Sequence, residues 1–110
     1  MRENKIYLQH ILEAIKKINR YTKGLSFDKF LENEEKKDAV VRNLEIIGEA
    51  ASKISPALRK KLPGIQWRDI VDMRNRLIHE YFGVDYEIVW NVVKVELPRL
   101  KEQLKKAVKL

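Results

Sequence analysis

The sequence predicts an all-α protein, an up-and-down bundle of four long helices with one or two short ones. Of its 110 residues, 45% are hydrophobic and 35% are charged, and only 4 are Gly and 3 are Pro, a balance that favours helices over sheets. Apolar side chains also recur at helical spacing along much of the chain. A chain of this length is expected to form one domain, spanning residues 1–110.

The first long helix is expected from Glu3 to Thr22, where Lys23-Gly24 provides a stop signal. Its apolar stripe consists of Leu8, Ile11, Leu12, Ile15 and Ile18. Ser26 is expected to cap a short helix that contains Phe27, Phe30 and Leu31.

A second long helix is expected to follow the charged run 32–37 and to end near Ile54. Its stripe consists of Val40, Leu44, Ile47, Ala51 and Ile54. Gly48 lies beside that stripe, where glycine destabilises a helix by about 1 kcal/mol relative to alanine. A glycine in this position indicates the close approach of another helix.

Helix-capping and helix-ending residues in the second half of the chain separate two more helices. Ser55-Pro56 is a cap followed by proline at the first helical position, so residues 57–61 should form a short helix. Trp67 then begins a helix that Gly83 ends.

The last helix is expected from Tyr86 towards Lys109, with Asp85 as its N-cap and a kink or shift at Pro98. Its first half is apolar on two sides, which suits burial against both the bundle and a second surface. One side carries Val89, Val93 and Leu97, and the other carries Ile88, Val92 and Val95.

Composition restricts the compartment and the partners. The chain has no cysteine and no apolar run near the roughly 18 residues of a membrane span, so we expect a cytoplasmic protein without a membrane partner. Its net charge is +7, and one acid-free patch contains Lys53, Arg59, Lys60 and Lys61. This charge indicates either an anionic partner or a solvated lysine-rich surface.

Arg74 raises the main question. On a helix, Ile70, Leu77 and Ile78 all fall within about 60° of it, so a permanent charge stands in the apolar stripe. A lone buried guanidinium is unfavourable by several kcal/mol unless it is paired or faces a wet cleft. It therefore either pairs with a carboxylate such as Asp69 or Asp72, or lines a binding groove.

His79 and Tyr81 follow on the same segment. Histidine is the side chain best suited to proton transfer near neutral pH, although a single histidine in a helical protein is more often a surface residue. Tyr81 falls on the Arg74 side of the helix, where an ordinary core tyrosine would also fit.

The pattern of Arg74, four residues, then His79-Glu80-Tyr81 resembles the signature of the HEPN superfamily in its HepT branch. The resemblance extends to Asn75, to Gly48-Glu49-Ala50 and to Trp67. It implies a small helical bundle that acts as a metal-independent endoribonuclease without a cofactor. It also implies a toxin that is paired with a minimal nucleotidyltransferase antitoxin of the MntA kind.

The resemblance assigns roles to individual residues. Arg74 would contact the scissile phosphate, His79 would move the proton of the 2′-hydroxyl or of the leaving oxygen, and Tyr81 would accept AMP from the antitoxin. Asn75 would orient His79 one turn later or hydrogen-bond the phosphate.

The chemistry adds a constraint, because cleavage through the 2′-hydroxyl benefits from both a base and an acid, and one chain offers one such histidine. A two-fold homodimer would supply both to one RNA substrate and would place Arg74 in a wet groove. Its interface is expected to use the helix of Arg74 and the side of the last helix that carries Ile88, Val92 and Val95. The alternative function is a non-catalytic subunit that holds RNA or nucleotide for a nucleotidyltransferase.

Overall fold

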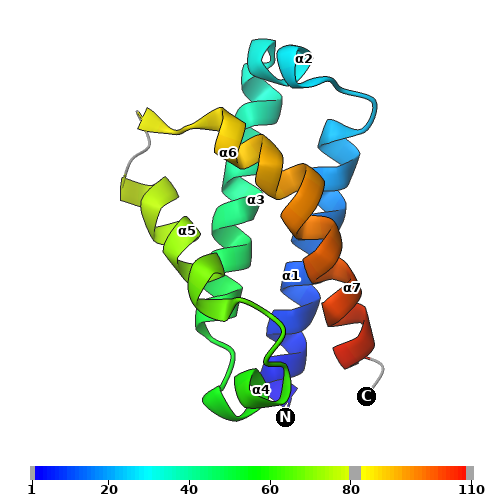
Figure 1. Ribbon diagram of the computed structural model, residues 1–110, viewed down its shortest axis with the longest axis vertical. Helices are drawn as coiled ribbons and strands as arrows, with labels where there is room; N and C mark the ends of the chain where they lie inside the picture. The colour runs from blue at the N-terminus through cyan, green and yellow to red at the C-terminus, as the bar shows by residue number, and fades with distance from the viewer. Residues whose placement is uncertain (1, 80–82, 109–110) are drawn as a thin grey trace.

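A computed structural model describes residues 2–79 and 83–108, and over these ranges the chain is helical with no strand. Four long rods run alternately up and down, as Figure 1 shows from the N-terminus in blue to the C-terminus in red. They are α1 (Arg2–Thr22), α3 (Glu34–Ser52), α5 (Trp67–His79) and the run of α6 (Tyr86–Asn91), η2 (Val92–Glu96) and α7 (Leu97–Val108). Two short helices, α2 (Phe27–Glu32) and α4 (Pro56–Lys61), link the rods at opposite ends. The predicted all-α bundle is confirmed.

Side-chain caps begin these helices where the sequence predicts them. Ser26 accepts from the amide of Lys29, Ser55 from Leu58, and Asp85 from both Glu87 and Ile88. Each bond satisfies amides that have no partner within their own helix. Two boundaries differ slightly from the prediction, because α1 begins at Arg2 and α3 ends at Ser52, with Lys53 as its C-cap. The predicted end of the Trp67 helix at Gly83 depends on residues 80–82, which lie outside the described residues.

The core lies between α1 and α3 and extends to the last rod. The apolar stripes predicted for the two long N-terminal helices point into it, although Leu12 is only partly buried. Fully enclosed side chains include Ile11, Ile15, Ile18, Phe30, Leu44, Ile47 and Leu104. Helix α5 packs against α3, so the position of the Arg74 helix depends on the surface of α3.

The backbone hydrogen-bond pattern of the last rod changes just before Pro98. Residues 92–96 form a π-helical turn, in which the Leu97 amide donates to the carbonyl of Val92, five residues back. A proline ring clashes with the carbonyl four residues before it, which here belongs to Lys94, and the wider turn relieves this clash. The predicted shift at Pro98 is therefore confirmed as a π turn.

The two-sided character of this rod is also confirmed. Val89, Val93 and Leu97 are buried, whereas Ile88 and Val95 remain 53% and 49% exposed. Val92 is partly buried against the core. No helix in the described ranges is long and apolar enough to cross a membrane.

Candidate functional site

Gly48 makes room for Arg74 where α3 and α5 meet. A Cβ built on Gly48 would overlap the Cβ of Arg74, and it would lie 2.7 Å from the Arg74 Cγ and 3.2 Å from the carbonyl oxygen of Ile70. These atoms are backbone or close to backbone, so they cannot move aside without moving α5. The predicted close approach of another helix at Gly48 is confirmed. The approaching helix is α5, which carries Arg74.

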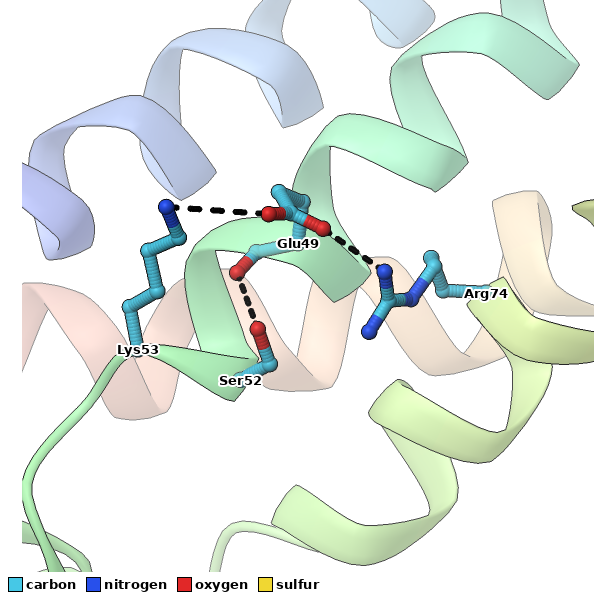
Figure 2. A network of polar contacts seen from close by, with 4 residues as sticks. All are labelled: Glu49, Ser52, Lys53 and Arg74. Carbon is cyan, nitrogen blue, oxygen red and sulfur yellow. Dashed lines mark hydrogen bonds and ion pairs between the residues drawn. The ribbon is translucent and has the colours of Figure 1, made fainter.

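The next residue, Glu49, binds the guanidinium group of Arg74. Its Oε2 accepts from Nη1 of Arg74 at 2.6 Å, and its Oε1 lies 3.7 Å from Nζ of Lys53. Figure 2 shows Glu49 between these two cations, with Arg74 coming from α5 and Lys53 from the end of α3. The prediction that Arg74 pairs with a carboxylate is therefore correct. The predicted partners were wrong, because the carboxylate belongs to Glu49 rather than to Asp69 or Asp72.

The ion pair leaves most of the guanidinium's hydrogen-bonding capacity unused. Arg74 has five N–H donors. Within the described ranges Nη1 donates to Glu49 and Nε is buried without a partner, so the donors that remain for a ligand are those of the terminal nitrogens. The Arg74 side chain is 19% exposed and that of Glu49 53%, so the pair stands at the surface of the α3–α5 seam. A partly exposed pair of this kind contributes about 0.2–1 kcal/mol. The contact therefore orients Arg74 more than it stabilises the fold.

His79 and Asn75 lie on α5 beyond this contact, and both are exposed. On a helix, five residues place His79 about 7.5 Å along the axis and about 140° around it from Arg74. Ideal helix geometry therefore directs the two side chains away from each other. No hydrogen bond joins Asn75 to His79 in the part of the chain that the structure describes. Tyr81, the predicted AMP acceptor, lies outside the described residues.

A groove of about 650 Å³ lies on the other flank of α5, between that helix and the last rod. Its lining includes Met73 and Arg76 from α5 and Ile88 and Val92 from the last rod. The two surfaces that the sequence suggested for one dimer interface therefore border different sides of α5. Within the described ranges, no group of three acidic or histidine side chains could hold a metal ion.

Glu49 is the site residue whose role sequence reasoning missed. Its Gly-Glu-Ala segment belongs to the resemblance, but the sequence assigns no contact to its carboxylate. The available signal is a glycine beside an apolar helix stripe, followed directly by an acid. Such a glycine indicates where another helix crosses, and the acid beside it can pair with a cation on that helix.

Together, the fold and the site fit the class of small all-α nucleases. An oriented cation can stabilise charge on a phosphate, and an exposed histidine can transfer protons, which are the two functions that phosphodiester cleavage requires. Both groups are present on one helix.

Comparisons with known proteins agree with this class. Residues 11–107 match the family described as Ribonuclease HepT-like. A putative RNase of Methanocaldococcus jannaschii is 44% identical over 108 residues, which cover 98% of this chain and 89% of that protein. A probable ribonuclease HepT of Thermococcus cleftensis is 43% identical over 105 residues, which cover 96% of each chain. No solved structure gives a significant match. The chain belongs to the HepT-like ribonuclease family.

Proposed function

We propose that this protein is a metal-independent endoribonuclease that cleaves RNA through attack of the 2′-hydroxyl. The observation that carries the proposal is the position of Arg74, which Gly48 and Glu49 of α3 fix at the surface with donor capacity to spare. An arginine held in this way can bind phosphate oxygens without reorganising in the transition state.

The reaction needs a base and an acid in addition to the cation. A base removes the proton of the 2′-hydroxyl, and the 2′-oxygen bonds to phosphorus. The bond from phosphorus to the 5′-oxygen then breaks, and an acid protonates that oxygen. The products are a 2′,3′-cyclic phosphate and a 5′-hydroxyl. The imidazole of His79 in one copy of the chain serves as the base, and the imidazolium of His79 in a second copy serves as the acid.

The function is tested by incubating single-stranded RNA with the wild-type protein in EDTA. The proposal expects cleavage that is lost in His79→Ala. Binding without cleavage by the wild-type protein would instead support the alternative, a non-catalytic subunit that holds RNA for a nucleotidyltransferase.

We expect the protein to form a homodimer, because each chain has one histidine near the site and that histidine diverges from Arg74 on the helix. Exposed apolar side chains are available on both parts of the proposed interface, with Ile78 44% exposed on α5 and Ile88 53% exposed on α6. Sedimentation at micromolar concentration should give a dimer. A monomer under those conditions that still cleaves RNA would contradict the two-copy site.

The proposal includes regulation by a nucleotidyltransferase antitoxin. In that reaction the Tyr81 hydroxyl attacks the α-phosphorus of ATP, pyrophosphate leaves, and AMP stays on the tyrosine. Tyr81 follows His79 by two residues, so the added phosphodiester and base would obstruct the RNA site. Its phosphate would also compete with RNA for Arg74.

Tyr81→Phe should keep most of the nuclease activity, because a phenol is not needed for proton transfer at neutral pH, yet it should escape inactivation. Intact mass is measured after co-expression with the nucleotidyltransferase. The wild-type protein should gain one AMP and Tyr81→Phe none. An AMP increment that persists in Tyr81→Phe would place the modification elsewhere, for example on Tyr86.

A further inference from the structure

The charge along the α3–α5 seam is strongly uneven on the two sides of Arg74. From Ala50 to Arg68 the chain has no acidic residue. The basic residues in that segment are Lys53, Arg59, Lys60, Lys61 and Arg68. The part of α3 that precedes Glu49 contains four acidic residues against three basic ones. A polyanion held at Arg74 therefore meets a net charge of +5 on one side and of −1 on the other.

Lys53 connects the basic side directly to the site. It shares the carboxylate of Glu49 with Arg74, one cation on each oxygen, and its own side chain is 52% exposed. The two cations flank a single negative charge (Figure 2), and all three side chains are at least partly exposed, so the cluster keeps a net positive charge at the surface. This arrangement extends the positive surface from α5 to the end of α3.

Arg59 fixes the next part of that surface. Its Nη2 donates to the carbonyl of Ala51 at 2.7 Å, and its Cζ lies 5.9 Å from the centroid of the buried Trp67 ring. These contacts hold α4 at the junction between the end of α3 and the start of α5. Lys60 and Lys61, which follow Arg59 on α4, are exposed. Arg59 is thus an anchor, and the two lysines are free to meet a ligand.

The opposite direction is unfavourable for a polyanion. A small hollow there is lined by Asp38 and Glu45 of α3, by Ile78 of α5 and by Tyr86. Burial raises the pKa of the Tyr86 hydroxyl above its ordinary value, and the charges of Asp38 and Glu34 raise it further. Carboxylates therefore act on the Tyr86 hydroxyl at that end of the seam, although Nζ of Lys37 lies 4.8 Å from the centroid of the same ring.

We propose that single-stranded RNA on one side of the scissile phosphate runs from Arg74 across a basic track formed by Lys53, Lys60 and Lys61. The inference rests on the proposed function for the position of the scissile phosphate. The track binds the sugar-phosphate backbone rather than particular bases, because lysine ammonium groups act as point charges on phosphate. It therefore increases affinity for longer RNA without setting the sequence that is cut.

Binding is tested in a His79→Ala background, so that affinity is read without cleavage. The probe is a fluorescein-labelled oligouridine of about 15 nucleotides, followed by anisotropy in EDTA at several salt concentrations. The test variant is Lys60→Glu with Lys61→Glu. The matched control is Lys16→Glu with Lys17→Glu, an exposed pair on α1 that changes the net charge equally.

The track variant should weaken binding by about tenfold or more and reduce the slope of log K against log salt by about 1 to 1.5, since each phosphate contact on a single strand contributes about 0.7. The control should change affinity by less than about threefold. Equal losses in both variants, or no loss in either, would overturn the track.

Cleavage by the wild-type protein separates this inference from the function on which it rests. If RNA is not cleaved in EDTA, the proposed nuclease fails, while the anisotropy comparison still decides whether the track binds RNA. If the wild-type protein cleaves RNA and the two charge-reversed variants bind alike, the track alone fails. Circular dichroism of both variants confirms that the helices are retained.

Discussion

Replacing His79 by alanine is expected to reduce RNA cleavage by about 10²- to 10⁴-fold, the range typical for loss of a general acid or base. Arg74→Ala is expected to reduce it by about 10²- to 10³-fold, because the cation that stabilises charge on the phosphate is removed. Both variants should also lose any growth inhibition that the wild-type protein causes. Cleavage rates at saturating RNA provide the measurement.

Both variants should remain folded, which distinguishes this result from simple destabilisation. His79 is exposed, and the Arg74–Glu49 pair is too exposed to contribute more than about 1 kcal/mol. Thermal unfolding should therefore change little, and Asp72→Ala, at an exposed position on the other flank of the same helix, provides a folding control. If Arg74→Ala unfolds the protein while His79→Ala stays fully active, the arginine has a structural role and the proposed site is wrong.

Gly48→Ala is expected to have the largest effect on stability. Alanine favours a helix, yet here its Cβ would overlap Arg74 and press on the Ile70 carbonyl, so α5 must move away from α3. Overpacking of this kind destabilises by about 1–3 kcal/mol. Urea unfolding measures the change, and cleavage should fall as well because the stem of Arg74 is displaced.

Gly83→Ala is the matched control for that variant. Among the residues that the structure describes, no atom lies within 4 Å of a Cβ built on Gly83, and the backbone of Gly83 does not require glycine. Gly83→Ala should therefore be neutral or slightly stabilising. If Gly48→Ala unfolds at the same urea concentration as the wild-type protein, the close approach of α5 to α3 does not hold in solution.

The helices could be predicted from the sequence because their signals are local. Ser26, Ser55 and Asp85 cap the helices that follow them, and Pro98 shifts the rod that contains it. Gly48 could also be interpreted correctly, since a glycine that weakens a helix beside its apolar stripe indicates that a second helix packs closely there.

The partner of Arg74 could not be predicted, because it depends on how two helices align. Asp69 and Asp72 are near Arg74 in sequence, but they lie on the opposite flank of α5, where they line the groove beside the last rod. Glu49 is far away in sequence and becomes adjacent only when α5 crosses α3 at Gly48. Helical periodicity specifies the face of a residue, whereas the register between helices decides which charge it meets.

The relation between Arg74 and His79 could be predicted only in part. The spacing of the two residues indicates a shared site, and the resemblance supplies their roles. The structure places them on one helix, and His79 is exposed. Ideal helix geometry separates the directions of the two side chains by about 140°, which is the reason for proposing a second copy. The second copy stays a prediction that sedimentation tests.

The central claim, metal-independent cleavage through the 2′-hydroxyl, is tested most directly with one modified substrate. The cut bond is first mapped on an unmodified RNA in EDTA, and the same RNA is then made with a single 2′-deoxy sugar immediately 5′ to that bond. We expect cleavage at that position to disappear, while the unmodified RNA yields a 2′,3′-cyclic phosphate and a 5′-hydroxyl. Cleavage of the 2′-deoxy substrate at the same bond, or activity that appears only when a divalent metal replaces EDTA, would contradict the mechanism.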